Sequence, residues 1–363
     1  MAASGPWATL IKPCLPWWVR CATPARMASI GVVGAGSWGT ALAKMLTEAG
    51  HRVRIWAFEP EVSLSINEAH ENALYLPGIE LPGDLRGTSD LQEAVAGCDV
   101  VVSVSPSHVV RAVMSDAKRH LAGTPYVVSA TKGVEDSSLL TMAGVLAEVL
   151  GPAFKERICA LSGPSFAREV AARIPTAVTL AAATQEVSEV VQKMFNTPYF
   201  RVYSSSDLVG VEIGGAVKNI IAVAAGVSDG LGFGASTRAA LITRGLAETV
   251  RLAVRLGADP LTLSGLAGLG DLVLTCTGDL SRNRTVGLRL GRGETIDQIL
   301  REMKMVAEGI KNTKSVRALA GKVQVEMPIT EQMYAVLYEG KSPRQVVTDF
   351  MARGLKAEFT RAL

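Results

Sequence analysis

The sequence contains few of the residues that build metal sites and disulfide frameworks. Four histidines and five cysteines occur among its 363 residues, and the cysteines are widely scattered with no C-x-x-C pair. This scarcity argues against the common zinc motifs, and an odd number of unpaired cysteines is typical of reduced thiols in the cytosol. We therefore expect no bound metal ion and a location in the cytoplasm.

An excess of charge is also missing from the body of the chain. The net charge of +3 reflects 37 basic and 34 acidic residues, and three of the basic ones, Lys12, Arg20 and Arg26, lie before Met27. The rest of the chain is therefore neutral and lacks the basic footprint of a nucleic-acid-binding protein. We expect no nucleic-acid partner.

Long apolar runs are absent as well. Residues 1–26 have no acidic side chain and no long apolar core, which argues against a secretory signal. We expect this segment to be an extension upstream of the true start or a disordered tail, and a transit peptide remains the alternative. The longest apolar stretch, 213–227, carries Lys218 and Asn219 near its centre, so we expect no membrane-spanning segment.

Short apolar runs in the first half of the chain predict a parallel sheet. Residues 29–60 have the pattern of a strand, a glycine turn, a helix over 40–49 that ends at Gly50, and a second strand. Separated by helical or polar segments, the runs indicate a Rossmann-like, doubly wound α/β domain over residues 27–205. Further runs typical of buried strands lie at 99–104, 126–130, 158–162 and 176–182.

Helical patterns dominate after residue 205. Residues 208–227 are apolar on nearly every face, which predicts a helix buried at the centre of a domain. We therefore expect an all-α C-terminal domain over residues 206–363. Two domains also agree with the length of the chain, since a domain usually has roughly 100–200 residues.

The turn after the first expected strand carries the dinucleotide-binding pattern G-A-G-S-W-G. Gly34 permits a tight turn, Gly36 lets backbone N–H groups approach a pyrophosphate, and Gly39 lets helix and strand pack closely. The start of the helix adds the positive end of its dipole. The pattern predicts NAD or NADP as the cofactor.

The choice between NAD and NADP depends on the end of the second strand. An acidic side chain there accepts a hydrogen bond from the ribose 2′-hydroxyl, whereas a basic one binds a 2′-phosphate. Glu59, twenty residues after Gly39, is the candidate acid and favours NAD. Arg52 and Arg54 lie close to it in the sequence, so NADP stays open.

Two isolated charged residues in the second half indicate acid–base chemistry. Lys218 lies in a helical pattern with no face polar enough to lead its side chain to solvent. A desolvated lysine has a lowered pKa and can act as a general acid or base near neutral pH. Asp271 stands alone among apolar residues and glycines and needs a cation, for which Lys218 is the candidate. A solvent-facing lysine and a helix-capping aspartate are the alternatives.

The run Ser281, Arg282, Asn283 and Arg284 offers two guanidinium groups, an amide and a hydroxyl from one turn. Guanidinium groups match phosphate oxygens in bidentate geometry, so the run predicts a phosphate-binding site. Together with a lysine acid and a nicotinamide, it indicates a substrate that carries both a phosphate and a carbonyl group. A solvated surface turn is the alternative.

These residues belong to a series of motifs that resembles the bacterial-type NAD(P)-dependent glycerol-3-phosphate dehydrogenases. The likeness runs from about Ser29 to Tyr338 and is carried, in order, by GAGSWGTALA, SATKG, LSGPSFA, GVEIGGAVKNIIAVAAG, GLGDLVLTC, LSRNRTVG and VAEG. Many members of that family have a basic residue where this chain has Phe58, which argues against a strong preference for NADPH. The family pattern has no counterpart of residues 1–26.

The resemblance implies an oxidoreductase that transfers a hydride between the nicotinamide and C2 of dihydroxyacetone phosphate, forming sn-glycerol 3-phosphate for glycerophospholipid synthesis. It implies that Lys218 donates and accepts the proton and that Asp271 orients it. A second copy of the chain, in a homodimer, is the protein partner that we consider. The implied substrate contacts are Lys132, Gly163, Ser165, Lys218, Asn219, Asp271, Thr275, Ser281, Arg282 and Asn283. The implied cofactor contacts are Gly34, Gly36, Ser37, Trp38, Gly39, Phe58, Lys132, Ala167, Arg282, Val306 and Glu308.

Two other functions stay open. A 3-hydroxyacyl-CoA-type dehydrogenase would use a histidine base, and none of the four histidines has a suitable setting in the sequence. A non-catalytic NAD(H)-binding redox sensor would need neither Lys218 nor the arginine run. Tight NADH binding without turnover would favour the sensor.

Overall fold

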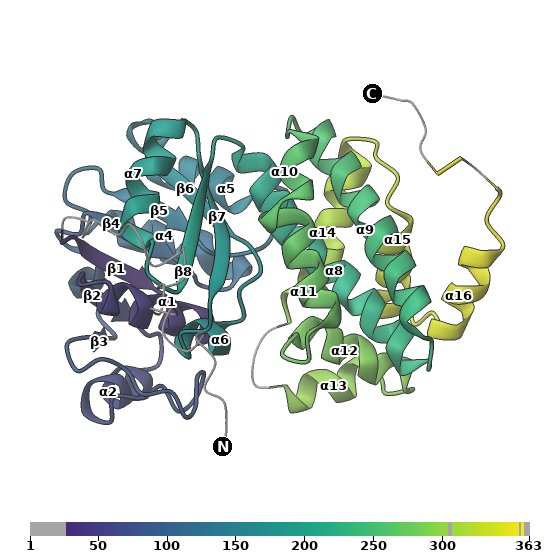
Figure 1. Ribbon diagram of the computed structural model, residues 1–363, viewed down its shortest axis with the longest axis horizontal. Helices are drawn as coiled ribbons and strands as arrows, with labels where there is room; N and C mark the ends of the chain where they lie inside the picture. The colour runs from purple at the N-terminus through teal and green to yellow at the C-terminus, as the bar shows by residue number, and fades with distance from the viewer. Residues whose placement is uncertain (1–26, 304–306, 356, 359–363) are drawn as a thin grey trace, which may run out of the picture.

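The computed structural model describes residues 27–303, 307–355, 357 and 358. Figure 1 shows two parts side by side: a sheet flanked by helices, formed by the first half of the chain, and a group of helices formed by the second half. The predicted Rossmann-like sheet followed by an all-α part is confirmed. Residues 1–26, for which we expected an extension, lie outside the described residues.

The first part is built on one eight-stranded sheet in the order β3-β2-β1-β4-β5-β6-β7-β8. Neighbouring strands are parallel except β6 and β7, which are antiparallel. Apolar runs carry no information on strand direction, so this antiparallel step was not expected. The strands are β1 (Ser29–Val33), β2 (Arg52–Trp56), β3 (Arg86–Thr88), β4 (Val100–Ser103), β5 (Tyr126–Ser129), β6 (Ile158–Ser162), β7 (Thr176–Ala182) and β8 (Phe200–Ser205).

Helices cover both faces of this sheet and close two apolar cores. Because successive residues of a strand point to opposite faces, Val32 belongs to one core, with Leu42, and Val33 to the other, with Met114. The helices are α1 (Ser37–Glu48), α2 (Pro60–Glu68), α3 (Leu91–Val95), η2 (Ser107–Val109), α4 (Val110–Lys118), α5 (Met142–Leu150), η3 (Pro152–Phe154), α6 (Ala167–Ala171) and α7 (Gln185–Phe195). Helix α1 starts directly after Gly36, earlier than the expected start at residue 40.

The long helix α8 (Leu208–Gly230) forms the centre of the second part. It is buried from Gly210 to Ser228, as its all-round apolar sequence predicted. By length and composition α8 could cross a membrane. However, 83% of its apolar 18-residue stretch is buried inside the protein, which is typical of a core helix. Around it lie α9 (Ala235–Arg255), α10 (Pro260–Ser264), η4 (Leu266–Gly270), α11 (Asp271–Thr277), α12 (Arg282–Gly291), α13 (Ile296–Glu302), α14 (Glu308–Lys322), α15 (Pro328–Tyr338) and α16 (Pro343–Met351).

Helices α8 and α12 pack with their backbones almost in contact. A Cβ atom on Gly226 would lie 2.0 Å from the carbonyl oxygen of Arg284, and one on Gly287 would lie 2.0 Å from that of Val223. No side chain fits at these distances, so the close crossing requires glycine on both helices. This crossing brings the start of α12, with the arginine run, beside the buried helix that carries Lys218.

Candidate active site

The glycine turn lies at the carboxyl end of β1, the edge where open α/β sheets bind their ligands. Gly34 has φ +126°, in the region that favours glycine, and a Cβ atom on Gly39 would lie 1.9 Å from the carbonyl oxygen of Gly34. A Cβ atom on Gly36 would meet no atom within 4 Å. Space is therefore left beside Gly36 at the start of α1, and this arrangement fits the pyrophosphate of a dinucleotide.

Asp271 binds two lysines that come from different parts of the fold. Its Oδ1 accepts a hydrogen bond from Nζ of Lys218 on α8 at 2.5 Å, and its Oδ2 accepts one from Nζ of Lys132, after β5, at 2.6 Å. Lys218 also donates to Oγ1 of Thr275 at 2.9 Å, and Lys132 donates to the carbonyl oxygen of Gly163 at 3.2 Å. The expected pairing of Lys218 with Asp271 is present, and Lys132 joins it as a second cation.

Close helix packing brings these charged groups together. Asp271 is the first residue of α11, and Thr275 lies one turn later on the same face. Gly215 precedes Lys218 by about one turn of α8, and a Cβ atom there would lie 2.8 Å from Oγ of Ser162 at the end of β6. The missing side chain at position 215 therefore lets α8 approach the carboxyl ends of the strands, where Lys132 lies.

Burial and the neighbouring charges set the protonation states of this cluster. Asp271 is 1% exposed and Lys218 is 8% exposed. Burial lowers the pKa of Lys218 to about 8; the charge of Lys132 acts in the same direction, and Asp271 opposes both. Burial acts to raise the pKa of Asp271, but Lys132 and Lys218 outweigh it, so this pKa is lowered. The carboxylate of Asp271 thus holds two cations, and one of them, Lys218, can release a proton near neutral pH.

The side chains of the run 281–284 make different contacts. Oγ of Ser281 accepts a hydrogen bond from the N–H of Arg284 at 3.2 Å and caps α12. The guanidinium of Arg284 forms ion pairs with Asp229 and Asp279, so it belongs to the scaffold of the helical part. Arg282 is exposed, and its side chain forms no hydrogen bond or ion pair within the described part of the chain. Of the four residues in the run, Arg284 is thus engaged by aspartates, and Ser281, Arg282 and Asn283 at the start of α12 stay the predicted phosphate site.

Asparagine side chains hold the start of α12 against α8 and α14. Oδ1 of Asn219 on α8 accepts a hydrogen bond from Nδ2 of Asn283 at 2.9 Å. Oδ1 of Asn283 in turn accepts one from the N–H of Gly309, near the start of α14, at 2.9 Å. Both amides are buried, which fixes the position of α12 relative to the lysine helix.

Glu308 connects the helical part to the sheet. Its carboxylate accepts hydrogen bonds from the hydroxyl of Ser107, at 2.7 Å, and from the backbone N–H of the same residue, at 3.2 Å. Ser107 follows β4, so this contact lies at the same carboxyl edge as the glycine turn. Although solvent still reaches Arg282, the surrounding protein partly desolvates its guanidinium and lowers its pKa, and the negative charge of Glu308 opposes that effect. Glu308 thus binds the sheet edge through Ser107 and also interacts electrostatically with Arg282.

Comparison with known proteins decides between the functions left open by the sequence. The family model of the N-terminal domain of NAD-dependent glycerol-3-phosphate dehydrogenase matches residues 29–188, and the model of the C-terminal domain matches residues 207–348. The chain belongs to this family. The family and enzyme class expected from the seven motifs, and NAD(P) as the cofactor, are therefore confirmed.

Individual relatives are similar over nearly their full length. The chain is 57% identical to the NAD(P)+-dependent glycerol-3-phosphate dehydrogenase of Geobacter sp. strain M21 over 91% of this chain and 98% of that protein. It is 56% identical to the enzyme of the same name from Syntrophobacter fumaroxidans, over 91% and 97% of the two chains. The crystal structure of glycerol-3-phosphate dehydrogenase from Coxiella burnetii superposes with a TM-score of 0.85 at 40% identity, covering 90% of this chain and 99% of that one.

The other site residues expected from the glycerol-3-phosphate dehydrogenase motifs occupy the ends of strands and helices. Gly163 follows β6 with φ +148°, and Oγ of Ser165 donates a hydrogen bond to its carbonyl oxygen at 3.0 Å. Ser37 begins α1 and Ala167 begins α6. Trp38 is partly buried, and its indole N–H has no hydrogen-bond partner within the described ranges. Phe58 is 78% exposed, just after β2, and Val306 lies outside the described residues.

Two residues beside the glycine turn were missed by the sequence analysis of this dehydrogenase. Nδ2 of Asn72, which is 1% exposed, donates a hydrogen bond to the carbonyl oxygen of Ala35 at 2.8 Å. The hydroxyl of Tyr75 donates to Oε1 of Glu59 at 2.8 Å. A polar side chain in a loop shows no periodicity that would reveal such a contact. Among the described residues, no group of three His, Cys, Asp or Glu could hold a metal ion.

Proposed function

We propose that this protein catalyses the reversible, NAD(P)H-dependent reduction of dihydroxyacetone phosphate to sn-glycerol 3-phosphate. The observation that carries the proposal is the buried cluster of Lys218, Asp271 and Lys132 at the sheet edge that also holds the glycine turn. An assay that follows oxidation of NADH and of NADPH with dihydroxyacetone phosphate tests substrate and cofactor together. An absence of turnover with both cofactors would contradict the proposal.

In this proposal Lys218 supplies the proton. The cofactor, when bound, supplies a hydride to C2 of the substrate, and negative charge develops on the carbonyl oxygen. Lys218 as the ammonium donates its proton to that oxygen, while Asp271 and Thr275 hold Nζ in place. Lys132 keeps a second positive charge beside the reacting oxygen, in a site where burial strengthens electrostatic interactions.

The substrate phosphate lies, in this proposal, at the start of α12. The side-chain oxygen of Ser281 takes the N–H of Arg284, which leaves the backbone N–H groups of Arg282 and Asn283 without an acceptor in the helix. These N–H groups and the positive end of the helix dipole favour an anion. The exposed guanidinium of Arg282 can then bind the phosphate oxygens. Binding of the phosphate, far from C2, would hold the substrate so that its carbonyl group is aligned for hydride transfer.

The lowered pKa of Lys218 predicts opposite pH profiles for the two directions of the reaction. Reduction needs the ammonium form, so its rate is expected to fall as the pH rises through about 8, the pKa of Lys218. Oxidation of glycerol 3-phosphate needs the neutral amine, so its rate is expected to rise over the same range. Measurement of kcat against pH in both directions, at saturating substrates, checks this. A reduction rate that stays constant from about pH 7 to about pH 9.5 would contradict it.

Replacing Arg282 with alanine is expected to weaken the binding of phosphorylated substrate. The loss of one desolvated charge pair costs about 2–5 kcal/mol, which would appear mainly as a higher KM for dihydroxyacetone phosphate. The matched control is Arg292→Ala, which removes an exposed guanidinium at the other end of α12. Unchanged KM and kcat in Arg282→Ala would remove Arg282 from the phosphate site.

We further propose the setting in which this reaction takes place. Residues 27–205 supply the cofactor site and residues 206–363 most of the substrate site. The enzyme works in the cytoplasm and supplies glycerol 3-phosphate for glycerophospholipid synthesis. The named family and the widely scattered cysteines, which are typical of reduced thiols in the cytosol, support this setting. Fractionation of cells that express the tagged full chain tests the location.

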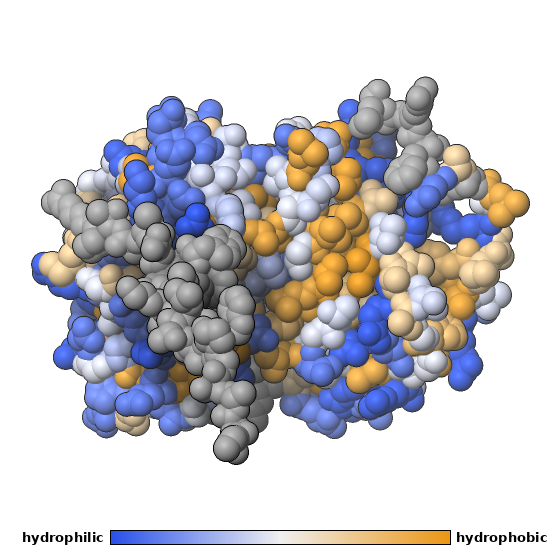
Figure 2. Space-filling model, in the orientation of Figure 1, coloured by the Kyte–Doolittle hydropathy of each residue, from blue (hydrophilic) through white to orange (hydrophobic). Residues whose placement is uncertain are grey.

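We also propose that two copies associate through the helical part. Figure 2 shows hydrophobic residues gathered on the face formed by α9, α10 and α11. Leu261 is 75% exposed, Val273 39% and Leu269 37%, and a contiguous apolar face of this kind often marks an interface between proteins. Light scattering on the purified chain is expected to give the mass of a dimer, and a monomer at micromolar concentration would contradict the proposal.

A further inference from the structure

We propose that Glu59, held in position by Tyr75, makes this enzyme select NADH over NADPH. The inference rests on the proposed function, since it concerns the cofactor of that reaction. Glu59 is the acceptor for the ribose 2′-hydroxyl of NADH, and its charge opposes the 2′-phosphate of NADPH.

Hydrogen bonds place Glu59 next to the glycine turn. The N–H of Gly34 donates to the carbonyl oxygen of Trp56 at 3.1 Å, so the end of β2 is bonded directly to the turn. Glu59 follows three residues later and forms the N-cap of α2. The carboxylate therefore lies at the same edge of the sheet as the glycine turn that fits the pyrophosphate.

A network of side chains in the loop 70–77 fixes the direction of this carboxylate. Asn72 donates to the carbonyl oxygen of Ala35 in the turn and to Oγ1 of Thr40, each at 2.8 Å, and its Oδ1 accepts the N–H of Tyr75 at 3.1 Å. The hydroxyl of Tyr75 then donates to Oε1 of Glu59 at 2.8 Å. The glycine turn and the acid are thus connected through two side chains of one loop.

Tyr75 leaves the second carboxylate oxygen as an acceptor. Burial, together with the hydrogen bond to Glu59 and its charge, raises the pKa of Tyr75 to about 12, so the hydroxyl stays a donor at neutral pH. Oε2 of Glu59 has no hydrogen-bond partner within the part of the chain that the structure describes. A carboxylate with one oxygen held and one oxygen open is suited to accept a hydrogen bond from a sugar hydroxyl.

The basic residues near this point in the sequence do not face it. Nη2 of Arg54 donates to the carbonyl oxygen of Ala96 and to Sγ of Cys98. Arg52 is exposed at the opposite end of β2. Arg168 contacts the loop farther along, where its Nη1 donates to the carbonyl oxygen of Pro77 at 3.1 Å. A 2′-phosphate beside Glu59 would therefore meet negative charge, and neither Arg52 nor Arg54 is placed to offset it.

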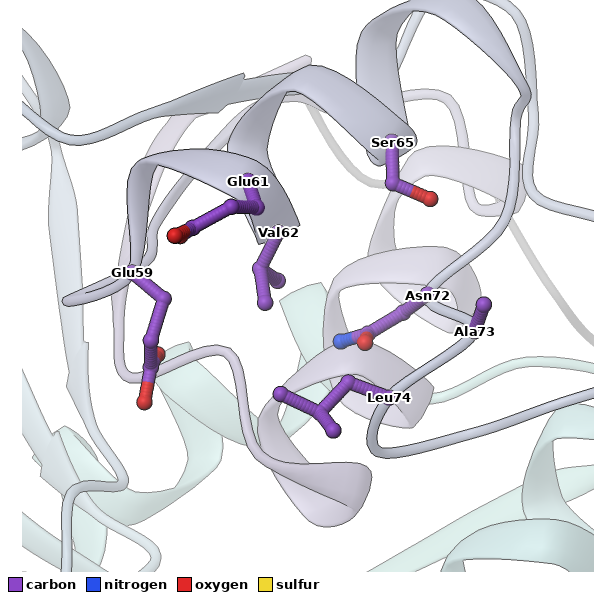
Figure 3. Close-up of a pocket in the computed structure, with 7 residues that line it drawn as sticks. All are labelled: Glu59, Glu61, Val62, Ser65, Asn72, Ala73 and Leu74. Carbon is purple, nitrogen blue, oxygen red and sulfur yellow. The ribbon is translucent and has the colours of Figure 1, made fainter.

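A pocket of about 400 Å³ opens beside Glu59. In Figure 3, Glu59 and Glu61 border one side of it, and Asn72 and Leu74 border the other. Its volume falls within the range of roughly 300–1,000 Å³ that is usual for small-molecule sites. The second acid, Glu61, adds to the negative potential that a 2′-phosphate would encounter there.

The test compares the affinities of the full chain for NADH and for NADPH in the absence of substrate. Each affinity is measured by titrating the protein with the cofactor and recording its fluorescence. We expect the wild type to bind NADH at least about tenfold more tightly than NADPH, because like charges in contact discriminate strongly. Glu59→Gln is expected to reduce the ratio to about threefold or less, mainly by improving NADPH binding. Tyr75→Phe should change the ratio in the same direction by a smaller factor. Glu59→Asp, which keeps the charge, should retain the preference.

Glu68→Gln is the matched control, since Glu68 is exposed at the far end of α2, and its ratio should equal that of the wild type. Equal or tighter NADPH binding by the wild type overturns the inference. So does a Glu59→Gln variant in which both affinities fall together, because that is the effect of a structural role. Turnover of dihydroxyacetone phosphate faster with NADPH than with NADH would overturn the inference and leave the proposed function intact. A failure of both cofactors to react would refute the function, and the affinity ratio would still decide the inference.

Discussion

Replacing Lys218 with alanine is expected to lower kcat for dihydroxyacetone phosphate reduction by roughly 10²–10⁴-fold, the range for loss of a general acid. Lys218 is buried, with its Nζ held by Asp271 and Thr275, so no solvent-exposed group can take its position. The glycine turn, which lies outside this contact, keeps its geometry. Steady-state kinetics measures the loss of kcat, and fluorescence titration should give an NADH affinity close to that of the wild type.

The matched control for this variant is Lys314→Ala. Lys314 lies on α14 in the same helical part, has a side chain that is 54% exposed, and pairs with the exposed Asp136. An exposed ion pair contributes about 0–1 kcal/mol, so this change should leave both kcat and stability near wild type. A Lys218→Ala enzyme with a rate close to wild type would end the proposal that Lys218 donates the proton.

Asp271→Asn is expected to have the second large effect, because it damages both stability and rate. The substitution keeps the shape of the side chain but leaves Lys218 without its charge partner at a buried position. Breaking a buried pair in this way costs about 3–5 kcal/mol of unfolding free energy, measured by urea denaturation. Loss of the carboxylate also removes the interaction that raises the pKa of Lys218, so the pH at which reduction declines should move below the wild-type midpoint.

Two further variants separate the causes of the Asp271→Asn effect. Asp279→Asn removes an aspartate that is 96% exposed and paired with Arg284, and it should change the unfolding free energy by less than about 1 kcal/mol. The double variant Lys218→Met with Asp271→Asn removes the two most deeply buried charges of the cluster and leaves only the more exposed Lys132, so it should recover much of the lost stability without recovering activity. A double variant as unstable as Asp271→Asn alone would show that the unpaired ammonium is not the cause.

The parts of the site that could be predicted from the sequence are those encoded by local patterns. The glycine turn depends on residues within one strand–turn–helix unit, and the buried helix depends on apolar residues on nearly every face from 208 to 227. Lys218 and Asp271 were found because each is a single charge in an apolar stretch, where burial requires a partner of opposite sign. The motifs that carry the family resemblance are of the same local kind.

Other features could not be predicted because they depend on contacts between distant segments. The side chains of Lys132 and Asp271 are separated by 139 positions in the chain. They meet because glycines such as Gly215 let α8 lie against the ends of β5 and β6. The local sequence also gave no reason to separate Arg282 from Arg284, whereas the fold brings Asp229 to Arg284 and leaves Arg282 exposed.

By itself, the sequence determined the class of fold, the dinucleotide turn and the two charged groups that must be neutralised inside the helical part. The reason is that hydrophobic periodicity and the cost of burying a charge act residue by residue. Only the tertiary structure decided which groups share that charge and which arginine stays exposed. It also decided how Tyr75 directs Glu59, because these contacts arise from the packing of helices and loops whose distances no local pattern records.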